Sequence, residues 1–169
     1  MDIKAKRALI RLFEAYVDLN SAKSLLAEEI ESRSLFHSQQ CVEKTLKACL
    51  AKVMVGDILS HTVVEYFEKR ILSDLPEELK ERFNNLSDII WVEERWIDTR
   101  YEEFEKDEIK IPSLRFSPKD AKLGVKIAEK VFFDGIDVVN YLFGENIPKD
   151  FKELREIVEK EKKLDIEVK

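Results

Sequence analysis

The chain has 169 residues, of which 44% are hydrophobic and 38% are charged, and its formal net charge is −6. This length and hydrophobic content suit one folded domain and exclude a disordered chain. Four Gly and four Pro are too few for a turn-rich β-sandwich or barrel, whereas abundant Glu, Lys, Leu and Ala favour long helices. The net charge excludes a uniformly basic nucleic-acid binder but does not exclude a local basic patch, because net charge does not say where the charges lie.

The sequence favours a cytoplasmic location. No apolar stretch near the N-terminus has the character of a signal peptide, and no apolar run reaches the ~18 residues of a membrane span. Cys41 and Cys49 are too far apart along one expected helix for a disulfide, so free thiols are expected. High Lys and Glu with little Gln is also typical of heat-adapted proteins.

The hydrophobic periodicity predicts an all-α fold, namely an antiparallel up-and-down bundle of four or five helices with an additional C-terminal helix. We expect residues 1–146 to form the bundle and residues 147–169 to form a C-terminal helical extension. Residues 102–115 are expected to form a loop with a brief extended stretch at 109–111. The expected bundle helices span residues 3–30, 34–55, 61–72, 76–101 and 118–143.

Local signals mark several helix features. Ser117-Pro118-Lys119-Asp120 places Ser at the N-cap, Pro at the first helical position and an acid at the third. Gly56 and Gly144 are expected to follow the last turns of their helices. Gly124 and Gly135, inside the fifth predicted helix, indicate either a close approach of a neighbouring helix or a simple loss of stability.

The sequence lacks the usual signatures of metal and nucleotide chemistry. No Glu-x-x-His motif, phosphate-binding Gly-rich loop or nucleophile elbow occurs. His37 and Cys41 have a spacing that would let them share a metal, but no second pair accompanies them, and a half-buried histidine beside a core thiol is favoured. We therefore expect no metal, no cofactor and no catalytic residue that is recognisable from a motif.

One face of the second predicted helix is polar. Its residues recur every three or four positions: Gln40, Glu43, Lys44 and Lys47. Composition alone favours a solvated face with a Glu43–Lys47 ion pair. Arg100 and Tyr101 end the fourth predicted helix, where such residues either cap the last turn or hold a phosphate and stack on a base.

These segments together resemble the HEPN domain family. The resemblance rests on the Gln-Gln-x-x-Glu-Lys-x-x-Lys-Ala pattern from Gln39 to Ala48, on His61 at the start of the next helix, and on the Arg100-Tyr101 pair. It spans about residues 9–144. It implies a helical bundle that often dimerises and that takes part in nucleotide and RNA transactions.

The resemblance implies two kinds of function. Many family members act beside a small nucleotidyltransferase as its substrate-binding or regulatory partner, and others are metal-independent ribonucleases, including toxins. The ribonuclease branch carries Arg-x(4–6)-His, and here no His follows Arg95 or Arg100. We therefore expect a non-catalytic nucleotide- or RNA-binding module, a homodimer with a nucleotidyltransferase partner protein and no membrane association.

The expected ligand site is a polar groove that combines cations for phosphates with an aromatic ring for base stacking. Its expected residues are Gln40, Glu43, Lys44, Lys47, His61, Arg100 and Tyr101. Two alternatives stay open. One is a ribonuclease that uses His61 or His37, and the other is a structural scaffold in which Trp91 and Trp96 face a partner instead of the core.

Overall fold

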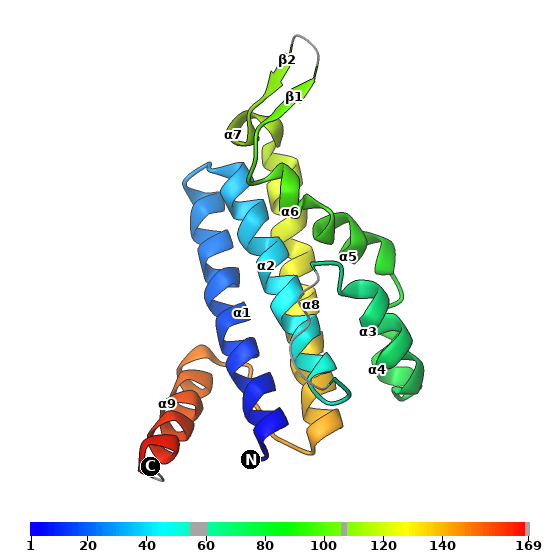
Figure 1. Cartoon of the computed structure of the whole chain (residues 1–169), viewed down its shortest axis with the longest axis vertical. Coiled ribbons are helices and arrows are strands. Elements are labelled where there is room, and N and C mark those ends of the chain that lie inside the picture. Colours follow the sequence, from blue (N-terminus) through cyan, green and yellow to red (C-terminus); the bar gives the residue numbers. More distant parts are fainter. Residues whose placement is uncertain (55–60, 106–107, 168–169) are drawn as a thin grey trace.

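Three long helices form the centre of the fold in the computed structural model, which describes residues 1–54, 61–105 and 108–167. These are α1 (Ile3–Ala27), α2 (Glu31–Leu50) and α8 (Pro118–Phe143), and they run side by side (Figure 1). α2 contacts both α1 and α8, so its buried side chains fill the middle of the core. The predicted all-α bundle is confirmed.

Small residues set the distance between α2 and α8. A Cβ atom added at Gly124 would overlap the Leu35 side chain, and one added at Gly135 would overlap the Thr45 methyl group. The glycines therefore mark a close helix approach, one of the two alternatives left open by the sequence. α8 begins with the predicted capping box of Ser117 and Asp120 and ends at Gly144 with φ 66°.

The first two helices have different bounds from those predicted. α1 ends at Ala27 instead of residue 30. α2 begins at Glu31, three residues before the predicted start. Ser34 does not cap the helix, since it is buried and its hydroxyl donates to the Ala22 carbonyl of α1. α2 ends at Leu50, and the predicted stop at Gly56 lies outside the described residues.

The chain between α2 and α8 is folded into short elements. They are α3 (Val64–Arg70), η1 (Leu72–Asp74), α4 (Glu77–Glu81), α5 (Leu86–Glu93), α6 (Arg95–Asp98), β1 (Glu103–Glu105), β2 (Glu108–Lys110) and α7 (Pro112–Arg115). The predicted continuous helix over residues 76–101 is wrong. The chain turns at Asn84-Asn85, a turn-favouring pair, and the ring of Phe83 packs 4.9 Å from that of Phe67.

The predicted loop over residues 102–115 contains an antiparallel hairpin. Phe104 pairs with Ile109 in the register of β1 and β2, which confirms part of the expected extended stretch. The hairpin projects from one end of the long helices (Figure 1). α7 follows it and leads into α8.

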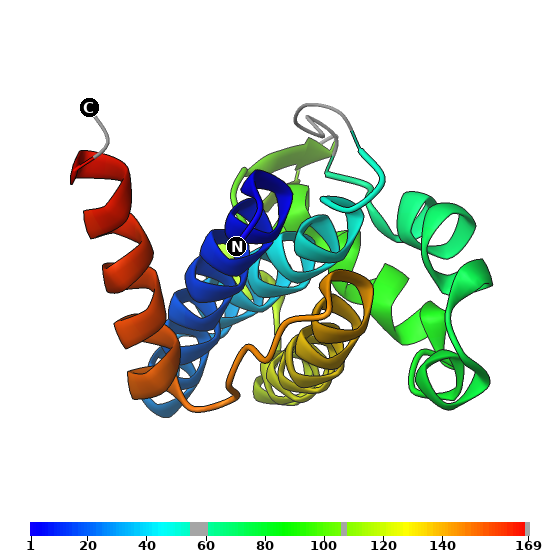
Figure 2. The ribbon, with the colours of Figure 1, turned by 90° about the horizontal axis from the view of Figure 1, so that it is seen from below.

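The last helix, α9 (Phe151–Glu167), packs along the outer side of α1 (Figure 2). The Phe151 ring stacks on Phe13 and Tyr16 at centroid distances of 5.7 and 4.6 Å. Leu154 is buried beside them. Among the described helices, none is long and apolar enough to cross a membrane.

Candidate functional site

A buried carboxylate organises the polar face of α2. Glu43 is 7% exposed and accepts hydrogen bonds from three side chains. The donors are Gln39 Nε2 at 3.0 Å, Lys47 Nζ at 2.8 Å and His61 Nδ1 at 3.0 Å. Gln39 is completely buried, so its amide has no access to solvent as an alternative partner. These four side chains, here called the Glu43 cluster, form one connected unit.

The charge of Glu43 fixes the tautomer of His61. Burial alone would raise the pKa of Glu43, but the bonds from Lys47, His61 and Gln39 outweigh it and lower the pKa below 4.5. Glu43 is therefore ionised at neutral pH and can only accept from the imidazole, which places a proton on His61 Nδ1. In the neutral imidazole, Nε2 then carries the free lone pair and can act as a base.

A second element holds the His61 ring. The indole of Trp96 on α6 stacks against it, with ring centroids 4.5 Å apart and an interplanar angle of 23°. The His61 side chain keeps 38% of its surface exposed, so solvent and ligands can reach it. Trp96 thus supports the candidate site, a role that the sequence did not indicate. Trp91 packs against the core instead.

Lys44 belongs to a separate ion pair on the α1 side of α2. Its Nζ lies 2.5 Å from Asp18, and His37 Nδ1 lies 2.8 Å from the other oxygen of the same carboxylate. Asp18 is 7% exposed. Each of two buried carboxylates therefore binds one histidine through Nδ1 and one lysine. The sequence analysis did not identify Asp18. The signal that could have identified it is its position, because it is a charged residue on the apolar stripe of the first helix.

Arg100 lies against the N-terminal half of α2, and the Tyr101 ring lies beside its guanidinium. The Arg100 guanidinium sits 5.5 Å from the centroid of the Phe36 ring and 5.4 Å from that of Tyr101. Within the described residues it has no carboxylate partner, so it is available to bind an anion. Gln40, one turn after Phe36, donates to Gln39 at 2.7 Å and links this region to the Glu43 cluster.

The predicted site residues therefore divide into three groups along α2. Glu43, Lys47 and His61 form one cluster, Lys44 pairs with Asp18, and Arg100 contacts the rings of Phe36 and Tyr101. Because Lys44 and Lys47 each pair with a carboxylate, the positive potential of this face is weaker than their number suggests.

Comparison with known proteins identifies the family of this chain. The sequence matches the HEPN domain family over residues 8–134. The chain belongs to the HEPN family. A relative from Methanocaldococcus jannaschii, named "Putative toxin MJ1304", is 35% identical over 129 residues, which cover 75% of this chain and 84% of the relative. The crystal structure of TT1696 from Thermus thermophilus has a similar fold, with a TM-score of 0.61 and 21% identity over 79% of this chain and 98% of that one.

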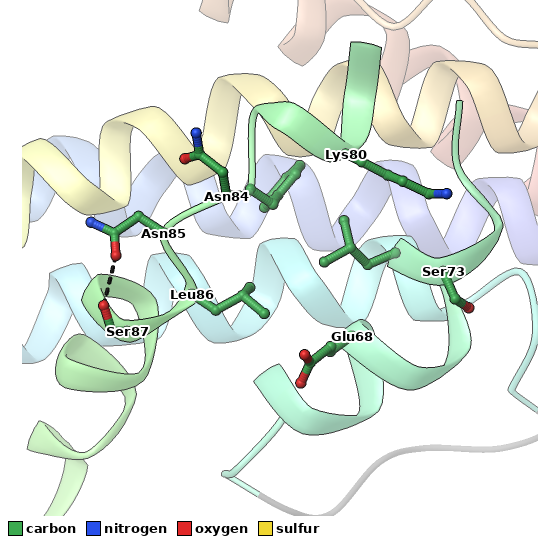
Figure 3. Close-up of a pocket in the computed structure, with 9 residues that line it drawn as sticks. Glu68, Ser73, Lys80, Asn84, Asn85, Leu86 and Ser87 are labelled. Carbon is green, nitrogen blue, oxygen red and sulfur yellow. Dashed lines mark hydrogen bonds between the residues drawn. The ribbon is translucent and has the colours of Figure 1, made fainter. Parts of the chain in front are cut away.

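This HEPN chain also has a cleft formed by its short helices. The cleft has a volume of about 730 Å³, and residues of α3, η1, α4 and α5 line it (Figure 3). Its polar lining residues are Glu68, Ser73, Lys80, Asn84, Asn85 and Ser87. It shares no residue with the Glu43 cluster. In the described parts of the chain, no group of three or more acidic, His or Cys side chains has the arrangement of a metal site.

Proposed function

We propose that this HEPN protein is the toxin component of a toxin–antitoxin pair, and that it cleaves RNA at the Glu43 cluster without a metal. The observation that carries the proposal is the geometry of His61. A carboxylate binds its Nδ1 and so leaves Nε2 as the reactive nitrogen, Trp96 stacks on its ring, and 38% of its side chain is exposed. The relative whose name reads "Putative toxin" supports the toxin assignment.

Such a histidine can act as a general base on RNA. His61 Nε2 would accept the proton of a ribose 2′-hydroxyl, and the 2′-oxygen would attack the adjacent phosphorus. The bond from phosphorus to the 5′-oxygen then breaks, and solvent supplies the proton that makes the leaving 5′-hydroxyl. The products are a 2′,3′-cyclic phosphate and a 5′-hydroxyl end. Glu43 stabilises the imidazolium that forms on His61 during this step.

The nearby cations can hold the substrate. Lys47 lies in the Glu43 cluster, and Arg100 has no carboxylate partner in the described part of the chain. Both can bind phosphate oxygens, and Tyr101, which is 52% exposed, offers a ring on which a base can stack. A strand held in this way should bind less tightly as salt is raised, because phosphate contacts release counterions.

A cleavage assay tests the proposal. The purified chain is incubated with end-labelled single-stranded RNA in excess EDTA, beside the variants His61→Ala and His37→Ala. His37 is the matched control, because it is the other histidine and also pairs with a buried carboxylate. We expect cleavage by the parent and by His37→Ala, and loss of cleavage in His61→Ala. No cleavage by the parent at high protein concentration contradicts the proposal, and so does full activity of His61→Ala.

A second candidate function is a non-catalytic nucleotide- or RNA-binding partner of a small nucleotidyltransferase, with the chain acting as a homodimer. The absence of an Arg-x(4–6)-His motif favours it. In this case Gln40, Lys44, Lys47 and Arg100 would hold the phosphates without any bond being cleaved. Lys44→Ala/Arg100→Ala should then weaken RNA binding and reduce its salt dependence, with no cleavage in the parent. Binding that is indifferent to salt and to both changes contradicts this candidate.

A further inference from the structure

Glu93, the last residue of α5, is a buried carboxylate outside the Glu43 cluster. Only 6% of its surface is exposed. One of its oxygens accepts the backbone N–H groups of both Val63 and Val64, the latter at 2.9 Å. The described residues include no cationic side chain paired with it. Burying a carboxylate is costly for the fold, and the two backbone N–H groups offset part of its lost hydration.

The two N–H groups belong to the start of α3, two and three residues after His61. Val63 is the N-cap residue of α3 and has no side chain that can cap the helix, so Glu93 supplies the acceptor from another element. Val63 and Val64 are themselves buried. The backbone two residues beyond His61 is therefore fixed to the end of α5.

His61 depends on this attachment because its ring must meet two groups at once. Glu43 binds it from α2, and Trp96 stacks on it from α6. α6 begins two residues after Glu93, so one short segment contains both the backbone anchor and the stacking partner. A shift of the α3 start would move the imidazole away from both.

We propose that Glu93 is a positioning residue for His61: by binding the Val63 and Val64 N–H groups, it holds the imidazole against Glu43 and Trp96. The importance of this for RNA cleavage rests on the function proposed above, whereas the positioning itself can be measured without RNA. The charge of Glu93 is not needed for the two hydrogen bonds, because a glutamine oxygen can accept both.

The test compares Glu93→Gln, Glu93→Asp and Glu93→Ala by NMR of the two histidine rings. Trp96 should shift the His61 ring resonances by its ring current, and His37 provides an internal reference in the same sample. We expect Glu93→Gln to keep the parent resonances. Glu93→Asp, one methylene shorter, should move the His61 resonances toward the values of a free histidine, and Glu93→Ala should move them furthest, with His37 unchanged in each case. Glu93→Asp keeps the comparison informative should Glu93→Ala fail to fold.

Unchanged His61 resonances in both Glu93→Asp and Glu93→Ala would overturn the inference, and so would a displacement in Glu93→Gln as large as that in Glu93→Ala. Cleavage provides a second readout, since small displacements of a reacting group reduce rates by on the order of 100-fold. Cleavage should fall in Glu93→Ala and recover in Glu93→Gln. Displaced His61 resonances in a protein that never cleaves RNA would support the positioning role and contradict the proposed function.

Discussion

Replacing Glu43 by alanine should destabilise the fold substantially, and the size of the effect follows from the groups left behind. Gln39 is completely buried and would lose the acceptor of its amide. A buried donor without a partner costs about 1–3 kcal/mol. Lys47 would lose the counterion of an ammonium group whose side chain is only 14% exposed. Its flexible stem lets the charge move toward water, so this loss adds about 1 kcal/mol. We therefore expect a decrease of roughly 2–4 kcal/mol in the free energy of unfolding.

Urea denaturation at pH 7 measures this change. Glu43→Gln, which keeps one acceptor oxygen, should lose less stability than Glu43→Ala. Glu65→Ala is the control, because Glu65 forms an exposed i,i+4 pair with Lys69, and such pairs contribute little to stability. An unfolding midpoint of Glu43→Ala equal to that of the Glu65→Ala control would refute the reasoning.

The lowered pKa of Glu43 also predicts how the stability of the fold depends on pH. The pKa of Glu43 is lowered from 4.5 in the folded protein, so the folded state binds this proton less readily than the unfolded state. The ionised Glu43 carboxylate therefore stabilises the fold above pH 4.5, and this stabilisation is lost as the pH falls through the pKa of the folded state. The stability difference between the parent and Glu43→Gln should therefore shrink as the pH is lowered from 7 to below 4.5. A difference that stays constant across this range contradicts the lowered pKa.

Three further predictions concern the fold around the site. Gly135→Ala should lower stability by about 1–2 kcal/mol in urea denaturation, because overlap with Thr45 outweighs the gain in helix propensity; a stabilised variant would contradict the close approach. Burial raises the pKa of Cys49 to about 12 and that of Cys41 further. Both thiols should therefore react slowly with a disulfide reagent at pH 8 and rapidly in denaturant, and fast reaction in the native protein would count against their burial. Phe151→Ala should speed amide exchange in α9 without affecting α2, whereas an equal effect on both helices would show that α9 does not open separately.

Much of the fold could be predicted because its signals are local. The capping box of Ser117 and Asp120, the stop at Gly144 and the apolar stripes of the long helices all act within a few residues. The break at Asn84-Asn85 was missed because the apolar spacing continues across it. Phe83, just before the turn, packs against Phe67, a contact that the spacing alone does not reveal. The hairpin pairing of Phe104 with Ile109 likewise depends on contacts across a loop.

The candidate site could be predicted only in part. Helical spacing identified Glu43 and Lys47 as neighbours, and the HEPN resemblance added His61, which the structure brings to the same carboxylate. Asp18 and Glu93 were missed because a charged residue is usually exposed. Their burial becomes understandable only when the partners from other helices or loops are known.

The most direct test of the proposed RNA site is a titration of the ¹⁵N-labelled protein with a short single-stranded RNA, followed by NMR. We expect the largest shift changes at the His61 ring and at the backbone amides of α2 from residue 40 to 47, and we expect them to diminish in high salt. A titration that leaves His61 unchanged, with shifts confined to His37 or to the cleft between α3 and α5, would contradict RNA binding at the Glu43 cluster.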